Sequence, residues 1–154
     1  DLFFSGMRPA VNVGLSVSRV GGDAQTKAMK KAAGSIRIDL AQYREMEVFT
    51  QFSSDLDEGT KEQLQYGKGL MELLKQPLCQ PLSMAEQVIT LYTATNKLFL
   101  DVDVKKIKAM QKDMLTYFKT EHPEIIQELN EKKVLSDELK ERILNAAKEF
   151  KSRC

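Results

Sequence analysis

One arginine in this sequence, Arg19, stands where its charged side chain could meet a ligand. Arg19 follows a stretch, residues 11–18, in which valine and leucine alternate with small or polar residues, and it precedes a glycine pair at 21–22. Alternation with a period of two predicts a buried strand, and the glycines allow the chain to turn after it. Arg19 is therefore expected at a strand end, where open sheets present functional groups to ligands. The residues alone leave open a second role for Arg19, as a structural ion pair.

The remaining residue types argue against a self-contained enzyme. The only histidine, His122, precedes a proline at an expected helix end, and we expect it to be a surface or helix-terminal residue. The two cysteines, Cys79 and Cys154, form no disulfide framework and favour a reducing compartment. No zinc site is expected, and there is no nucleophile–base set, P-loop or GxGxxG motif.

Composition narrows the class of protein further. The 154 residues carry a net charge of +1, with basic and acidic side chains mixed along the chain, which gives no sign of binding to nucleic acid or anionic lipid. No apolar run approaches the roughly 20 residues of a membrane helix, and the opening DLFFSGM has no basic region typical of a signal peptide. The chain opens abruptly, as a piece of a larger fold would.

Helical patterns dominate after residue 22. Predicted helices run from a cap at Asp23 to Ala33, over 35–52, over 61–75, from a capping box at Ser83 and Glu86, from Asp101 or Asp103 to His122, from Pro123, and from Ser136. Gly67 and Gly69 inside the helix at 61–75 cost about 1 kcal/mol each and suggest close approach of another backbone.

The predicted fold class is mainly α: a short β-strand remnant at 1–22, followed by a bundle of short helices at 23–154. A lone strand is marginal in water, so residues 1–22 need a sheet that this chain does not supply. We expect them to pair with a neighbouring copy, giving self-association, or to pack back onto the helices.

Four segments resemble one family closely. The runs are GMRPAVNVGLSVSRVGGDAQTKAMKKAAGSIRIDLAQYRE (6–45), FTQFSSDLDEGT (49–60), GLMELLKQ (69–76) and AEQVITLYTA (85–94), and they resemble the alpha subunits of the F-type (rotary, proton-translocating) ATP synthases. After Asp101 the likeness thins to helical pattern. The resemblance implies the last strands of an incomplete nucleotide-binding domain at 1–22 and a C-terminal helical domain at 23–154, with the P-loop upstream.

The resemblance also assigns roles to particular residues. Arg19 matches the arginine of a VSR motif that reaches into the catalytic site of the neighbouring beta subunit as an arginine finger, and Ser18 would position its loop. Phe3 and Arg8 match residues that line the adenine pocket of the alpha subunit's own non-catalytic nucleotide site, and Gln76 matches a glutamine there. For Phe3 and Gln76 the residues leave open the alternatives of a core side chain and a helix-terminal residue.

One position departs from the family pattern at this pocket. The family often has a second glutamine two residues after the first, where this sequence has Leu78. Leu78 cannot make the hydrogen bonds of an amide.

Partners and ligands follow from the same resemblance. It implies a non-catalytic, regulatory subunit that couples proton transport to ATP synthesis or hydrolysis in an alternating hexamer with beta subunits, peripheral on the coupling membrane and on the cytoplasmic face if bacterial. ATP or ADP with Mg would bind the full-length subunit. This chain lacks the P-loop, so we expect it to bind no nucleotide tightly and to be inactive alone. Residues 53–59, with Asp55, Asp57 and Glu58, would face the central-stalk gamma subunit. The alternative is an independent all-helical interaction module with a docking N-terminal strand.

Overall fold

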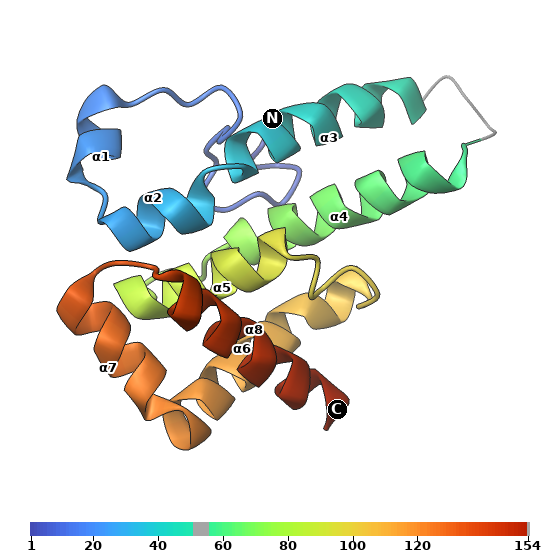
Figure 1. Ribbon diagram of the computed structural model, residues 1–154. Coiled ribbons are helices and arrows are strands. Elements are labelled where there is room, and N and C mark those ends of the chain that lie inside the picture. The colour runs from blue at the N-terminus through green and yellow to red at the C-terminus, as the bar shows by residue number, and fades with distance from the viewer. Residues whose placement is uncertain (51–55, 154) are drawn as a thin grey trace.

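The computed structural model describes residues 1–50 and 56–153. Within those ranges the chain forms eight helices and no strand, so the expectation of a mainly helical bundle is confirmed (Figure 1). The helices are α1 (Arg19–Ala24), α2 (Lys27–Ala33), α3 (Ile36–Thr50), α4 (Glu58–Leu74), α5 (Met84–Thr95), α6 (Val104–Glu121), α7 (Pro123–Lys132) and α8 (Asp137–Ser152).

Helix α5 lies at the centre of the packing. It contacts α2, α4, α6, α7 and α8, and its Ala85, Val88 and Ile89 are fully buried. Helices α3 and α4 run side by side as an antiparallel pair above this group (Figure 1). The core therefore includes residues of α2 to α8, and α3 contributes Ile36 and Leu40 to it.

The strand predicted from the alternating pattern at residues 11–18 is wrong. Residues 8–18 form turns and irregular backbone, and Arg19 begins a short helix. Local hydrogen bonds form instead: the side chain of Asn12 accepts from the N–H of Leu15 at 3.2 Å, and the Asn12 carbonyl accepts from Ser16 at 2.9 Å. A strand needs a neighbouring strand for its backbone groups, and the described residues contain none.

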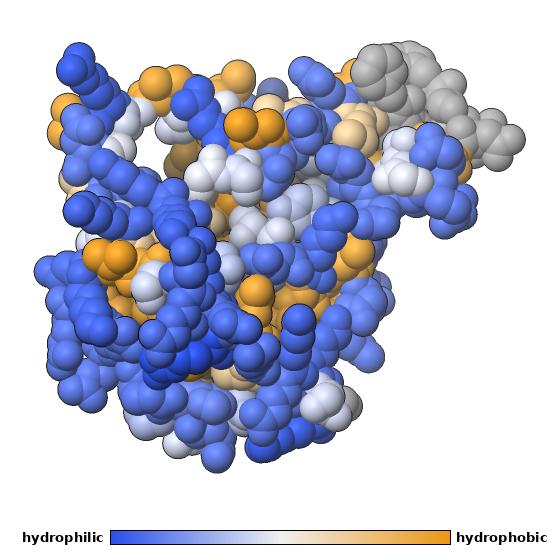
Figure 2. Space-filling model, viewed as in Figure 1, coloured by the Kyte–Doolittle hydropathy of each residue, from blue (hydrophilic) through white to orange (hydrophobic). Residues whose placement is uncertain are grey.

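Most of the apolar residues expected in the strand therefore lie at the surface. Leu15 and Val17 expose 77% and 75% of their surface, and Phe4 and Val20 are also exposed. Figure 2 shows hydrophobic residues at the surface over this N-terminal region. Part of the segment packs back onto the helices, which was one of the two arrangements expected for residues 1–22. Met7 is buried, and Val13 packs against the core.

Most predicted helix starts are confirmed. A cap bonds to backbone groups only a few residues away, so the sequence shows it directly. Ser83 and Glu86 form the capping box, with the Ser83 N–H donating to Glu86 Oε2 at 2.7 Å. Asp103 caps α6, Pro123 is the first residue of α7, and Ser136 caps α8.

Two predicted boundaries needed correction. Asp23 lies inside α1, and Thr26 caps α2 instead, its side chain accepting from the N–H of Met29 at 3.2 Å. Helix α4 begins at Glu58 rather than residue 61, because Asp57 is its cap. The predicted end of the second helix at Phe52 lies outside the described residues.

Gly67 provides the close helix approach that its sequence position suggested. A Cβ added to Gly67 would lie 2.3 Å from two ring carbons of Tyr43 on α3, which is far inside contact distance. A Cβ added to Gly69 would lie 3.4 Å from the end of Ile107 on α6, an ordinary contact. Only Gly67 is therefore required by the packing of α3 on α4.

Candidate functional site

Three of the five predicted site residues lie together, although they come from distant parts of the sequence. The guanidinium carbon of Arg8 stands 4.4 Å from the centre of the Phe3 ring. The N–H of Gln76, two residues beyond α4, donates to the carbonyl of Arg8 at 2.9 Å. Phe3 exposes half of its surface, so it is not a core residue. The arrangement presents a cation–aromatic pair, with the backbone of Gln76 held against that of Arg8.

These three residues are among those that line a wide groove of about 1510 Å³. The segment from Glu72 to Leu82 also lines it, together with residues of α5 and α6. A groove of this size could accommodate a small ligand such as a nucleotide. Leu78 lies on the rim, 91% exposed, where it offers only apolar surface.

The groove is lined by more cations than anions. Lys75 pairs with Glu72 at 2.6 Å, and Lys119 pairs with Glu86 at 2.6 Å. The remaining cations are Arg8, Lys108 and Lys112, for which no ion pair is found in the described residues. Their excess positive charge favours a ligand that carries negative charge.

Glu86 is held as a carboxylate on the wall of this groove. Burial alone would raise its pKa, but hydrogen bonds from Lys119 and from Ser83 outweigh burial, and the pKa of Glu86 lies below its ordinary value. Glu86 thus serves the capping box of α5 and the ion pair to α6 at once. This carboxylate is occupied by structural contacts.

The other two predicted site residues, Ser18 and Arg19, do not line the groove. Ser18 caps α1, and its Oγ accepts from the N–H of Gly21 at 2.9 Å. Arg19 is the first residue of α1, its side chain is exposed, and no ion pair to it is found in the described residues. The structural ion pair that the sequence left open is therefore not formed in this part of the chain, and the catalytic role stays a prediction.

The acidic segment at 53–59 is only partly described. Residues 53–55, including Asp55, lie outside the described residues. Asp57 caps α4: its Oδ1 accepts from the N–H of Thr60 at 2.8 Å, and this hydrogen bond lowers the pKa of Asp57. Asp57 therefore has a structural role whether or not it also meets a partner.

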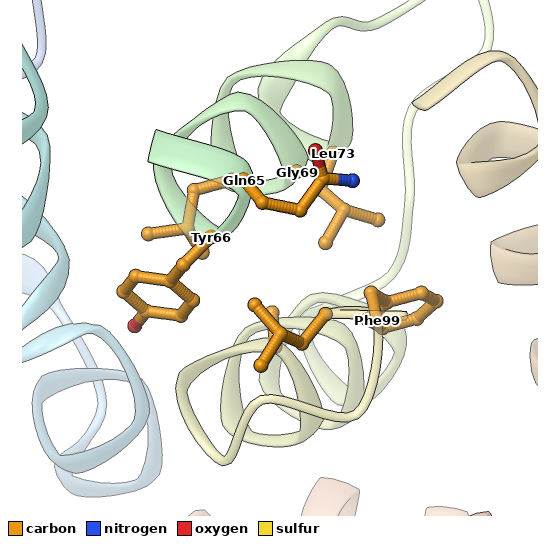
Figure 3. A pocket seen from close by; sticks show the side chains of 8 residues that line it. Gln65, Tyr66, Gly69, Leu73 and Phe99 are labelled. Carbon is orange, nitrogen blue, oxygen red and sulfur yellow. The ribbon is translucent and has the colours of Figure 1, made fainter. Parts of the chain in front are cut away.

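A second cavity lies between α4 and the segment that follows α5 (Figure 3). Gln65, Tyr66, Gly69, Leu73 and Phe99 line it, and its volume is about 10 Å³. This is room for one water molecule at most. It is a packing defect and no ligand site.

The described residues hold no group of three His, Cys, Asp or Glu side chains placed to bind a metal ion. His122 lies between α6 and α7, where its Nδ1 stands 3.4 Å from Glu124 and its Nε2 stands 3.4 Å from the Tyr117 hydroxyl. Among the residues that the structure describes, no helix has the length and apolar character needed to cross a bilayer.

The sequence comparisons define the class of protein. Residues 25–150 match the family model described as ATP synthase alpha/beta chain, C terminal domain, so the chain belongs to the family of ATP synthase alpha and beta chains. Within that family it is similar to alpha subunits, as the four sequence segments indicated.

Two bacterial relatives show the extent of the likeness. ATP synthase subunit alpha of Clostridium kluyveri is 51% identical over 151 residues, and that of Clostridium botulinum (strain Eklund 17B / Type B) is 52% identical over 151 residues. Each alignment covers 98% of this chain and 30% of the relative. The chain therefore spans about 30% of the length of these relatives and matches their C-terminal region.

Sequence reasoning missed the buried polar contacts in the lining of the groove. Thr90 and Gln111 are 2% and 5% exposed, and Gln111 Nε2 donates to Thr90 Oγ1 at 3.3 Å. Lys108 donates to Gln111 Oε1 at 3.0 Å. The available signal was Lys108 and Gln111 at a spacing of three on the apolar side of a helix, but ordinary surface residues show that spacing too.

Proposed function

We propose that this chain forms the C-terminal part of an ATP synthase alpha subunit and that Arg19 acts on phosphate groups held by a neighbouring beta subunit. The observation that carries the proposal is that Arg19 is exposed and has no carboxylate partner among the described residues. A guanidinium without an internal partner suits a role toward another chain. The close match of residues 6–45 to the alpha family supports the same role.

We propose in addition that Phe3, Arg8 and Gln76 hold the adenine of a nucleotide that belongs to the alpha subunit itself. The stacking of Arg8 on Phe3 gives a face on which a purine can lie, and the amide of Gln76 can read a base edge. The phosphates and Mg²⁺ would be held by the P-loop of the full-length subunit. Arg8 and the unpaired lysines of the groove favour an anionic ligand.

The wider assembly follows from this role. The chain would pack around the central-stalk gamma subunit through the helical domain, with the segment 53–59 facing it, and the complex would lie peripherally on the coupling membrane, on the cytoplasmic face if bacterial. The complex would couple proton transport to ATP synthesis or hydrolysis. The exposed apolar residues of the N-terminal segment, among them Leu15 and Val17, would be covered by the nucleotide-binding domain.

The alternative function is an independent interaction module that docks through its N-terminal segment. The same exposed apolar residues favour it. The two functions differ in one result. A full-length subunit carrying this chain assembles with beta subunits if the first proposal holds, and an independent module would not.

The test of the catalytic role is Arg19→Ala in the full-length alpha subunit, assembled with beta and gamma subunits. Loss of an arginine finger costs on the order of 10³–10⁵ in rate, so ATP turnover should fall by at least about 10³ while the complex still assembles. Arg19→Lys should restore little, because lysine lacks the planar fork of donors. Arg153→Ala, which removes an exposed arginine near the C-terminus, is the matched control. Turnover near the unmodified rate in an assembled Arg19→Ala complex would refute the role.

A further inference from the structure

A line of polar contacts among residues that line the groove joins three helices. Gln111 of α6 donates to Thr90 of α5 at 3.3 Å, and Lys108 Nζ of α6 donates to Gln111 Oε1 at 3.0 Å. Lys108 Nζ also donates to the carbonyl of Leu73 at 2.9 Å, in the last turn of α4. Thr90 and Gln111 are almost fully buried, so their polar atoms depend on one another for partners.

The carbonyl of Leu73 needs the partner that Lys108 supplies. In a continuing helix this carbonyl would accept from the residue four positions later, but that residue is Pro77, which has no N–H. The C-terminal end of a helix also carries partial negative charge, which a cation stabilises. Lys108 meets both needs at one atom.

Lys108 is half-buried, and none of its contacts in the described residues is an ion pair. Burial lowers its pKa, the negative charge of Glu72 opposes that effect, and the positive charge of Lys75 adds to it. A cation kept in such surroundings is costly unless its hydrogen bonds are well made. The two oxygens that Lys108 contacts therefore also fix its own position.

The end of α4 is the point from which the predicted base-contacting residue departs. Gln76 follows Leu73 by three residues, and its N–H donates to the carbonyl of Arg8 at 2.9 Å. The start of the segment that carries Gln76 is therefore held on one side by Arg8 and on the other, through Leu73, by Lys108. All of these residues line the same groove.

We propose that Lys108 is a positioning residue that sets the place of Gln76 at the adenine, and that Gln111 and Thr90 hold Lys108 for this purpose. The inference rests on the proposed function, because it assumes that the groove takes a purine nucleotide. A side-chain amide distinguishes adenine from guanine only when its donors and acceptor lie within a fraction of an ångström of the base edge. Losing the hydrogen bond from Lys108 to the end of α4 should therefore lower the ATP-to-GTP preference of a subunit that still folds.

The experiment uses the full-length alpha subunit that carries this chain, without beta subunits, so that only its own site binds. Affinities for ATP and for GTP are measured separately by equilibrium dialysis. Lys108→Met leaves two buried oxygens without a donor, so ATP affinity should fall by about tenfold and the ATP-to-GTP preference should fall toward that of Gln76→Ala. Lys108→Arg keeps the charge and donors and should retain most of the preference.

Lys112→Met is the matched control. Lys112 lies on the same helix and lines the same groove, and no hydrogen bond of its side chain is found within the described residues. Because the charge of Lys112 acts alike on the phosphates of both nucleotides, Lys112→Met should lower the affinities for ATP and GTP by the same factor and leave the ATP-to-GTP preference and the thermal midpoint unchanged. If Lys108→Met fails to fold, Gln111→Met is measured in its place, because it removes the acceptor that orients Lys108 and should lower the preference in the same direction.

The outcomes separate this inference from the function on which it rests. A Lys108→Met subunit that loses thermal stability yet keeps its ATP-to-GTP preference would show that Lys108 is purely structural, and the inference would be wrong. A Gln76→Ala subunit with unchanged preference would overturn the proposed adenine site itself. A changed preference in Gln76→Ala with none in Lys108→Met or Gln111→Met would overturn only the positioning role.

Discussion

The contact between Gly67 and Tyr43 gives the sharpest test of the fold. Replacing Gly67 by alanine places a methyl group 2.3 Å from two ring carbons of Tyr43 and 2.5 Å from its Cβ. Ordinary contacts begin near 3.4 Å, so the difference between 2.3 and 3.4 Å, about 1.1 Å, must come from moving the two helices apart. Rotating the tyrosine ring gives no relief, because the Tyr43 Cβ is itself in the way.

Two effects set the size of the change. Overpacking in a core costs about 1–3 kcal/mol, and this clash belongs at the upper end because it involves backbone-linked atoms. Alanine returns about 1 kcal/mol of helix propensity relative to glycine. The expected result for Gly67→Ala is a loss of about 2 kcal/mol in the free energy of unfolding, measured by urea titration.

Gly69→Ala is the matched control on the same helix. Its new methyl group would meet only the flexible end of Ile107 at 3.4 Å. The propensity gain should then dominate, and the free energy of unfolding should stay unchanged or rise by up to about 1 kcal/mol. If Gly67→Ala proves as stable as Gly69→Ala, the close packing of α3 on α4 described above is incorrect.

Two further predictions concern the helical core. Phe118→Ala empties a fully buried site on α6 and should cost about 3–5 kcal/mol in thermal or urea unfolding, whereas Leu78→Ala, 91% exposed, should stay within about 0.5 kcal/mol; equal losses in the two variants would contradict the assigned core. Glu86 has a folded-state pKa below its ordinary value of 4.5, so its contribution to stability is present above that value and is lost as pH falls through the lowered folded-state pKa. Glu86→Gln should therefore flatten the acid side of a stability-against-pH curve, and an unchanged slope below pH 4.5 would show that the Lys119 and Ser83 contacts do not favour the carboxylate.

Much of the helical layout could be predicted because helix ends are local. Ser83, Asp103 and Ser136 each accept from a backbone N–H two or three residues ahead, so a few consecutive residues carry all the information needed. Pro123 likewise suits a first helical position whatever surrounds it. The error at Asp23 has the same origin, since Thr26 is an equally good cap three residues later.

The N-terminal segment shows where local pattern failed. Alternating valines and leucines indicate a strand only if other strands complete its backbone hydrogen bonds, and the described part of the chain provides none. In their absence Asn12 forms a turn, and Ser18 caps a helix that begins at Arg19. Arg19 is exposed, as its expected role toward a ligand requires, but it lies at the start of a helix and not at the end of a strand.

The sequence by itself determined the helical class and most of the helix caps, and its resemblance to ATP synthase alpha subunits indicated the family. The prediction that Phe3, Arg8 and Gln76 belong to one site came from the same resemblance. The tertiary structure alone brought Gln76 to the carbonyl of Arg8 and linked Lys108 to the end of α4. The physical reason is distance along the chain. A cap joins neighbours, whereas these contacts join residues 68 and 35 positions apart, and only the packing of whole helices can decide which of them meet.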